Sequence, residues 1–492
     1  MTPALAGGGK FGHGAAAMTE PADKKPATTS ANAAPPEETR SELSSSLSVA
    51  VPLALTNLGN IAMNTTDVVM IGWLGAEALA AGVLGFTMLF LFLLMGLGMT
   101  SAVSPLTAQA YGAGDIAGVR RTIRQGFWAV VLFCIPAIAI LMNGETILLW
   151  LGQDPLASRR AGVYLTIAAW SLPFILWFTV LRALLATIDR TAIVFGITCL
   201  GIVMNGLLNY GLIFGNWGMP RLEIAGAAVA LVATSATGFV LLALYVALHP
   251  ATRGYRVFMR LWRSDIERLK AIGRLALPIS LTMLLEEGLF ATATIMVGWL
   301  GPVALAGHTI ALQCASVAFS IPLGIGQAGT VRVGIAAGRR DSRAVGHAGW
   351  TAIGLGLGFM ILSALTFWIF PEPLARLFLD SSDPDAGAVL SIAVALLAVA
   401  AVFQIFDGVQ VVGLGILRGL NDTRVPLGFA IFGYWICGAP LAYVLGFVAG
   451  YGAVGVWSGF ILGLGVMAGL ILMRFGGRDR YGLVAKFIPA ES

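Results

Sequence analysis

The stretch LTMLLEEGLFATATIMVGWLG, residues 281–301, decides the fold, because it is mainly apolar over a length that spans a bilayer. Two adjacent carboxylates, Glu286 and Glu287, lie well inside it. A charged side chain at bilayer depth costs roughly 2.5–3.5 kcal/mol on insertion scales, so an ionisable residue there is expected to serve a function. The stretch therefore predicts a membrane helix that carries part of a functional site.

The same stretch has a counterpart in the first half of the chain. A shift of 226 residues lays residues 51–75 on residues 277–301 without a gap. The register continues further, so that Gly98 pairs with Gly324 and Gly112 with Gly338. The residues that recur within the segment are Pro52, Leu55, Thr56, Leu58, Thr66, Met70 and Gly72-Trp73-Leu74-Gly75. The chain is therefore predicted to be an internally duplicated membrane protein.

Composition supports an all-α integral membrane protein. Of the 492 residues, 58% are hydrophobic and only 11% are charged, which is far from the composition of a soluble domain. The length leaves room for about a dozen helices of ~20 residues. Apolar spans are expected at about 47–72, 79–108, 126–144, 161–187, 192–215, 225–248, 271–299, 303–333, 348–370, 386–418, 425–449 and 452–474. These twelve spans divide into six for each half.

The distribution of Lys and Arg predicts the orientation. With a cytoplasmic N-terminus, only four of the 30 basic residues lie in external connectors, namely Arg159, Arg160, Arg221 and Arg376. Positive charge is enriched in cytoplasmic connectors, so both termini are expected inside a multi-pass protein of the cell inner (plasma) membrane. Because each half has an even number of spans, the repeats share one topology, and a pseudo-two-fold axis runs along the membrane normal.

This topology predicts the domain boundaries. Residues 1–45 are rich in Ala, Pro, Gly, Ser and Thr without an apolar core, so we expect a disordered cytoplasmic tail and no cleavable signal peptide. Translation from Met1 and from Met18 both remain open. The expected units after the tail are a six-helix N-lobe (46–249), a basic cytoplasmic connector (250–270), a six-helix C-lobe (271–475) and a C-terminal cytoplasmic tail (476–492).

Several motifs of enzymes and ATP-driven proteins are missing from the sequence. No G-x-x-x-x-G-K-[ST] phosphate loop is present, so ATP hydrolysis within this chain is not expected. The four cysteines lie singly in apolar runs, which is typical of small core residues. The net charge of +5 is no signal for nucleic acid, because the basic residues lie in the connectors. His308 is either a proton relay or, as we favour, a hydrogen-bonded residue near a helix start.

In the first half, polar residues occupy one face of the first span. Thr56, Asn60, Asn64 and Asp67 follow at i, i+4, i+8 and i+11, so they are predicted to face the bundle interior or water. Hydrogen bonding between helices explains Thr56 and Asn64 well but Asp67 poorly, because amides and hydroxyls bond without a charge. On the fifth span, Asn205 and Asn209 are again spaced i, i+4. They either converge with Asp67 on a cation or simply pack.

In the second half, Glu286 stands where the first half has Asn60, and Asp407 lies in another apolar span between Gln404 and Gln410. A structural role for protonated, hydrogen-bonded acids is the alternative interpretation. It is less favoured because structure does not require two carboxylates at depth in one lobe. If Glu286 and Asp407 share a cavity, they titrate as one unit. Glu287 points about 100° away from Glu286 and is assigned a secondary role.

Such a pair of acids suggests antiport. The site can take a proton, a Na⁺ ion or an organic cation, but not all at once. Ligands that compete for one carboxylate have a negative coupling free energy, and this exclusivity couples the entry of one to the release of another. No bound cofactor is expected, and any metal ion at Glu286 and Asp407 would be Na⁺ in transit.

In its duplicated spans, its repeated segment and its buried acids, the chain resembles the NorM-like branch of the multidrug and toxic compound extrusion (MATE) family over about residues 47–475. The segment NTTDVVMIGWLG is similar to the acidic segment of span one in that family and implies a functional role for Asp67. The segments LLEEGLF and FDGVQVVGLGILRGLNDT resemble the second-lobe cation site of the branch, which uses a Glu and an Asp. The resemblance places these roles on Glu286 and Asp407.

The resemblance also has a departure. Many relatives carry Thr after a G-A-A-x-A pattern on span six, where this chain has Leu231, although Thr234 lies one turn on. The departure weakens the prediction of a complete first-lobe cation site around Asn205 and Asn209. The implied mechanism is alternating access, in which two lobes rock around a central cavity and Na⁺ or H⁺ entry drives the export of organic cations. We expect a monomer.

Two alternatives remain. A flippase for lipid-linked saccharides of the same superfamily should hold a diphosphate with basic residues, yet the middles of the spans contain almost no Lys or Arg. A membrane-embedded enzyme such as a prenyl transferase should carry an Asp-rich metal motif, which the sequence lacks. A purely structural membrane protein leaves Asp67, Glu286 and Asp407 unexplained.

Overall fold

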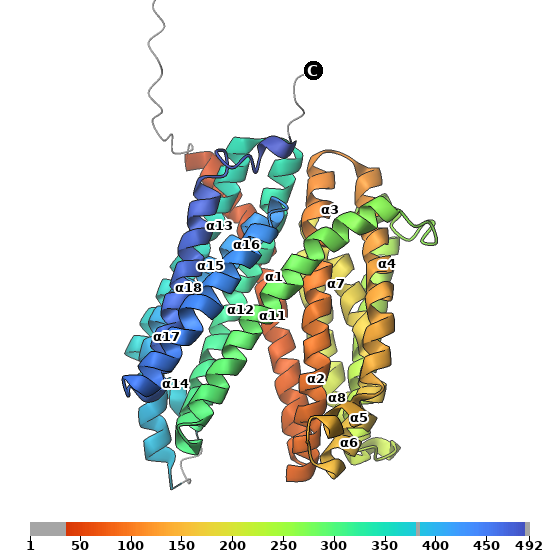
Figure 1. The fold of residues 1–492 in the computed structure, drawn as a ribbon. Helices are drawn as coiled ribbons and strands as arrows, with labels where there is room; N and C mark the ends of the chain where they lie inside the picture. Colours follow the sequence, from red (N-terminus) through yellow and green to blue (C-terminus); the bar gives the residue numbers. More distant parts are fainter. Residues whose placement is uncertain (1–35, 380–383, 488–492) are drawn as a thin grey trace, which may run out of the picture.

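The computed structural model describes residues 36–379 and 384–487, and these residues form an all-helical protein (Figure 1). The helices make two bundles that stand side by side and lean together at one end. The first lobe contains α1 (Pro36–Gly72), α2 (Ala76–Ser101), α3 (Val103–Gly112), α4 (Ile116–Leu141), α5 (Gly144–Trp150), α6 (Pro155–Ala168), α7 (Ser171–Thr187), α8 (Thr191–Phe214), η1 (Asn216–Gly218) and α9 (Ile224–Leu248).

The second lobe follows a short helix, α10 (Pro250–Arg253), and the basic connector. It contains α11 (Ile266–Gly298), α12 (Pro302–Gly338), α13 (Ser342–Ile369), α14 (Pro371–Arg376), α15 (Ala386–Gly419), α16 (Arg424–Ala430), η2 (Ile431–Gly438), α17 (Ala439–Tyr443), η3 (Val444–Val448), α18 (Gly452–Gly476) and η4 (Ala485–Phe487). Each lobe has its own core of buried apolar residues. Each core belongs mainly to one sequence repeat, but the start of α1 (Val49, Ala50, Leu53) packs into the second core and the start of α11 (Ile272, Ala276, Ile279) into the first.

The spans agree closely with the number expected from the sequence. Within the described residues, eleven helices are long and apolar enough to cross a membrane, or twelve if the bent pair α6 and α7 forms one span. That pair bends by 44° across Ala169 and Trp170, whereas its counterpart α15 is one continuous helix. The chain is therefore a multi-pass membrane protein.

The structure corrects the boundary of the N-terminal tail. We expected residues 1–45 to be a disordered tail, but α1 already begins at Pro36. Proline is tolerated in the first helical turn because its missing N–H has no intrahelical partner there. Glu42, within the supposed tail, forms an ion pair with Arg332 of α12. Residues 1–35, including the alternative start Met18, lie outside the described residues.

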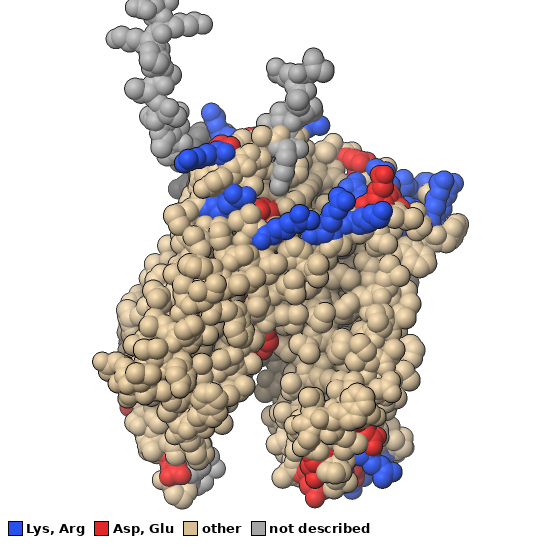
Figure 2. Space-filling view, in the orientation of Figure 1, with Lys and Arg blue, Asp and Glu red and all other residues tan. Residues whose placement is uncertain are grey.

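One end of the molecule is rich in basic residues. Figure 2 shows most of the visible Lys and Arg side chains gathered at the end where the lobes meet, and a gap between the lobes at the opposite end. The connector with Arg253, Arg256 and Lys270 joins the lobes at this basic end. We call the two ends of the molecule the basic end and the open end.

Paired glycines bring the lobes together. A Cβ atom added at Gly98 would lie 2.6 Å from the backbone of Ser280 on α11, and one added at Gly324 would lie 2.6 Å from the backbone of Ala54 on α1. Gly98 and Gly324 are related by the sequence repeat, and so are Ala54 and Ser280. The same contact therefore occurs twice, once on each side of the pseudo-two-fold axis.

A second glycine pair lies nearer the basic end. A Cβ atom added at Gly112 would overlap the backbone carbonyl of Ile335, and one added at Gly338 would overlap that of Gln109. These four residues again form two pairs related by the repeat. Glycine lets two backbones approach this closely. The glycines that recur in the sequence are thus the points where α3 and α12 close the basic end.

Polar contacts reinforce this closure. Gln109 Nε2 donates a hydrogen bond to the carbonyl of Gly419 at 2.8 Å, and Asn421 Nδ2 donates to Gln109 Oε1 at 2.8 Å. Arg332 Nε donates to Glu42 Oε1 at 2.9 Å, and its Nη2 donates to the second carboxylate oxygen. We call these contacts, together with the Gly112 and Gly338 pairs, the basic-end seal.

Candidate functional site

The two acids of the second lobe lie in one cluster. Gln410 of α15 donates from Nε2 to Glu286 Oε1 of α11 at 2.8 Å and to Asp407 Oδ1 at 3.3 Å. Asp407 is 4% exposed and Gln410 is fully buried, whereas Glu286 is half-buried. A single amide nitrogen therefore bridges carboxylates that lie far apart in the sequence.

Tyr434 completes this acid cluster. Its hydroxyl donates to Gln410 Oε1 at 2.5 Å, and the side chain is fully buried. It lies on η2 (Ile431–Gly438), a π-helical segment that contains Gly433 and Gly438. Both glycines pack closely against Gly463 of α18, and π-helical turns are frequent at functional sites. Tyr434 was not among the residues selected from the sequence, because a single tyrosine in an apolar span has no distinctive spacing from Glu286 or Asp407.

The amide of Gln410 is oriented by its neighbours. Its oxygen accepts from Tyr434, so its nitrogen faces Glu286 and Asp407. The nitrogen thus lies between two groups that prefer a cation. A proton or a metal ion there would compete with this amide donor. Rotation of the amide would turn its oxygen towards the carboxylates, which would suit a hard cation such as Na⁺.

The remaining predicted residues of the second lobe lie around the cluster. Gln404 is 1% exposed and accepts from Ser363 Oγ at 3.2 Å, while its own Nε2 is buried without a partner. Glu287 is exposed, and no hydrogen bond or ion pair joins it to another described residue. The structure therefore separates the two adjacent glutamates, as their helical spacing predicted.

In the first lobe, Asp67 meets the asparagines of α8. Asn209 Nδ2 donates to Asp67 Oδ1 at 2.5 Å and approaches Asn205 Oδ1 at 3.2 Å. Asn205 and Asn209 are fully buried. Asn205 Nδ2, Asn209 Oδ1 and the hydroxyl oxygen of Thr234 are buried without hydrogen-bond partners. Thr234, one turn beyond the departure at Leu231, also packs towards α8 through Gly201.

The polar face predicted for α1 does not form one network. Thr56 donates to the carbonyl of Pro52, and Asn60 is exposed. Neither Asn60 nor Asn64 forms a side-chain hydrogen bond with another described residue, and only Asp67 contacts the asparagines. α1 packs against α12 along one part and α8 along another. A face that is continuous on the helix therefore meets different neighbours along its length.

His308 has two structural partners. It is 1% exposed, its Nδ1 accepts from Trp457 Nε1 at 3.0 Å, and its Nε2 lies 3.1 Å from Thr294 Oγ1. Since Nδ1 accepts, Nε2 carries the proton and donates to Thr294. These bonds explain His308 as a residue that joins α11, α12 and α18.

No cluster suited to a transition metal is present in the described part of the chain, where no group of three or more His, Cys, Asp and Glu side chains converges. The acid cluster instead offers two carboxylates, one amide and one phenol. Oxygen donors of this kind suit a proton or a hard monovalent cation better than a soft metal.

The chain is similar to known proteins over both of its halves. The MatE family profile matches residues 52–211 and 278–444, which are the two repeats. A protein of Agrobacterium fabrum named "Probable multidrug resistance protein NorM" is 42% identical over 435 residues, covering 88% of this chain and 94% of the relative. A protein of the same name from Mesorhizobium japonicum is 42% identical, covering 91% and 96%.

Solved structures share the fold. The crystal structure of the Vibrio cholerae MATE transporter VcmN in the bent form has a TM-score of 0.80 at 19% identity, covering 92% of this chain and all of that one. A second structure, described as the outward-facing conformation of a multidrug resistance MATE family transporter, has a TM-score of 0.82 at 20% identity, covering 90% and 97%. With both repeats matched, the chain belongs to the MatE family of membrane transporters and is not an enzyme.

Proposed function

We propose that this chain is a multidrug exporter of the NorM type that releases organic cations in exchange for Na⁺ or H⁺. The single observation that carries the proposal is the acid cluster, in which Gln410 bridges Glu286 and Asp407 inside a lobe made mainly of apolar helices. The names of the relatives, which are multidrug resistance proteins, support the same function.

The acid cluster explains how one ligand can displace another. Two carboxylates held by one amide cannot both remain charged and unpaired in an apolar lobe, so each occupancy has to neutralise them. A proton, a Na⁺ ion and an organic cation all do so, and each excludes the others. A coupling free energy of this kind links the entry of one cation to the release of another.

Alternating access uses the basic-end seal. We assign the basic end to the cytoplasm, with both termini inside, because positive charge is enriched on that side of membrane proteins. The described conformation is then closed to the cytoplasm and open outwards, as the gap in Figure 2 suggests. Transport requires the seal to open while the outer ends of the lobes close. Each lobe, with boundaries near 46–249 and 271–475, moves as one unit of a monomer.

The first-lobe cluster is assigned a supporting role. Asp67 and Asn209 offer a carboxylate and an amide, but the unpaired oxygen of Thr234 lies one turn from the position at which many relatives have Thr. We propose that this cluster binds substrate or a proton, and that the coupling ion binds at Glu286 and Asp407.

The experiment is efflux of a fluorescent organic cation from proteoliposomes under an imposed Na⁺ gradient and then under an imposed proton gradient. Glu286→Gln and Asp407→Asn should each abolish gradient-driven efflux. Glu287→Gln is the matched control, because it removes the adjacent, exposed carboxylate, and it should have a milder effect.

The outcomes separate the parts of this proposal. Efflux driven by Na⁺ alone would identify Na⁺ as the coupling ion, and efflux driven only by protons would identify H⁺. Wild-type efflux from Glu286→Gln or Asp407→Asn would refute the site assignment. No response to either gradient would refute drug antiport.

A further inference from the structure

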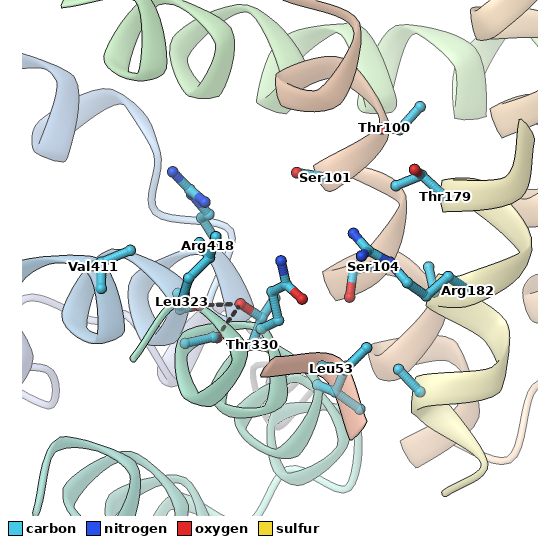
Figure 3. Close-up of a pocket in the computed structure, with 16 residues that line it drawn as sticks. Leu53, Thr100, Ser101, Ser104, Thr179, Arg182, Leu323, Thr330, Val411 and Arg418 are labelled. Carbon is cyan, nitrogen blue, oxygen red and sulfur yellow. Dashed lines mark hydrogen bonds between the residues drawn. The ribbon is translucent and has the colours of Figure 1, made fainter. Parts of the chain in front are cut away.

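A small pocket lies between the two lobes (Figure 3). Its volume is about 70 Å³, and its sixteen lining residues come from both lobes. Two of them are arginines, Arg182 of α7 and Arg418 of α15. Thr100, Ser101 and Ser104 line the side formed by α2 and α3.

The two arginines occupy similar places in the repeats. Arg182 stands in the sequence Leu-Arg-Ala-Leu (181–184), and Arg418 in Leu-Arg-Gly-Leu (417–420). Each lies close to the end of its helix, α7 or α15, at the basic end. Each lobe therefore contributes one guanidinium to a pocket that both lobes enclose.

The pocket has an excess of positive charge. None of the sixteen lining residues is Asp or Glu. Neither arginine forms an ion pair or a side-chain hydrogen bond with a described residue. Glu286 attracts Arg418 electrostatically but forms no hydrogen bond with it. Both arginines are partly exposed to the pocket, and an anion bound there would gain charge-assisted hydrogen bonds that no described residue supplies.

Three hydroxyl groups of the pocket already use their protons elsewhere, and Gln327, whose Oε1 is buried without a hydrogen-bond partner, also lines it. Thr100 and Ser101 donate their hydroxyl protons to the carbonyl of Leu97, and Thr179 donates to the carbonyl of Ile175. These hydroxyls therefore present only acceptor capacity to the pocket. The charged donors that remain for a ligand are the two guanidinium groups.

We propose that Arg182 and Arg418 bind the carboxylate of zwitterionic substrates, whose cationic group remains in the cleft towards the acids. This inference rests on the proposed export function and specifies a class of substrate for it. Guanidinium binds carboxylate with paired, charge-assisted hydrogen bonds. The pocket is open to the cleft between the lobes, so the body of a substrate can lie outside it while the carboxylate reaches the two arginines.

The geometry also gives the carboxylate a role in transport. Arg182 belongs to the first lobe and Arg418 to the second, so an anion bound to both bridges the lobes. Opening of the basic-end seal separates these two elements and removes one of the two partners. A zwitterion is therefore held more tightly in the described conformation than in one that is open at the basic end.

The test compares two dyes that differ by one group. Tetramethylrhodamine free acid carries a carboxylate, and its methyl ester is a cation without one. Binding of each to the purified full-length protein in detergent is measured by fluorescence polarisation, and the readout is the ratio of the ester Kd to the acid Kd. Arg182→Gln and Arg418→Gln should each lower this ratio about tenfold, as expected for the loss of one charge-assisted pair.

Two further variants separate charge from folding. Arg182→Lys and Arg418→Lys keep the positive charge. Their ratio of ester Kd to acid Kd should therefore lie between those of the wild type and the Gln variants. Arg159→Gln, at an exposed position in the α6 region outside the pocket, is the matched control and should leave the ratio at its wild-type value. An unchanged ratio in both Gln variants, or an equal loss of affinity for both dyes, would overturn the proposal.

A chloride ion is the other source of an anion for this pocket. If the site binds a carboxylate, the ratio of the ester Kd to the free-acid Kd should stay the same when chloride is replaced with gluconate. If ester binding instead collapses without chloride and the two dyes behave alike, the carboxylate assignment is refuted. If the wild type exports the dyes but binds both with the same Kd, only this inference is refuted. If the wild type neither binds nor exports either dye, the proposed function is refuted as well.

Discussion

Gly338→Ala tests whether the basic-end seal controls the conformation. Gly338 ends α12, and an added Cβ would overlap the backbone carbonyl of Gln109 in the other lobe. A backbone atom cannot rotate away as a flexible side chain can. The lobes must therefore separate slightly at this end, or the local backbone must shift, before the seal can close.

The size of the effect follows from two opposing contributions. Extra atoms in a closely packed contact cost about 1–3 kcal/mol. Alanine also stabilises a helix by roughly 0.5–1 kcal/mol relative to glycine, but that gain applies to both conformations and cancels in their ratio. A net penalty of ~2 kcal/mol on the sealed conformation moves the equilibrium about 30-fold towards the conformation that is open at the basic end.

The assay is double electron–electron resonance between spin labels at the open end. Trp150 of the first lobe is 84% exposed and Leu377 of the second is 76% exposed, so both positions accept a label. The four native cysteines are unpaired and are replaced first. If the lobes rock as rigid bodies, loss of the seal brings these labels closer, and Gly338→Ala should increase the population at short distances.

The control is Gly354→Ala on α13. An added Cβ at Gly354 meets nothing within 4 Å, so this variant gains helix propensity without a contact between the lobes. Its distance distribution should match that of the wild type. If Gly338→Ala also matches the wild type, the glycine contacts do not control closure, and the reasoning from the sequence repeat to the seal is refuted.

Two further predictions concern other contacts. Glu42→Gln leaves Arg332 without its ion pair, in which both side chains are only about 20% exposed. As with Gly338→Ala, the population at short label distances should increase, here by a change of about tenfold in the ratio of open to sealed conformations. Glu372→Gln breaks an exposed pair with Arg376 and should cause no shift; equal behaviour of the two variants would contradict a sealing role. Tyr434→Phe removes the hydroxyl that orients Gln410, so gradient-driven efflux should fall about tenfold while the protein remains folded, as judged by thermal unfolding. Full efflux from this variant would show that Tyr434 only packs.

Much of the fold could be predicted from the sequence because membrane helices leave a strong local signal. Long apolar runs predicted the spans, and the repeat predicted two lobes of the same topology. The family assignment followed from the same residues and is shown by the relatives. The start of α1 was missed, because residues 36–45 are mainly polar and carry no apolar run that marks a span.

The candidate site divides in a similar way. Acids stand out in apolar spans because burying a charge is costly, so Glu286, Asp407 and Asp67 could be selected without a structure. Gln410 and Tyr434 could not be assigned their places between these acids, because glutamine and tyrosine are common in helices and have no fixed spacing from Glu286. Asn60 was selected for its spacing and is exposed, which agrees with a face towards water, and its role in the site stays a prediction.

The sequence by itself determined the membrane class, the duplication and the acids, because each is encoded in the order and polarity of neighbouring residues. The tertiary structure alone decided what those residues meet. The recurring glycines became the contacts of the seal, and Arg182 and Arg418, which are 236 positions apart in the sequence, came to line one pocket. Contacts of this kind depend on how separate helices pack against one another, and no local pattern along the chain records that packing.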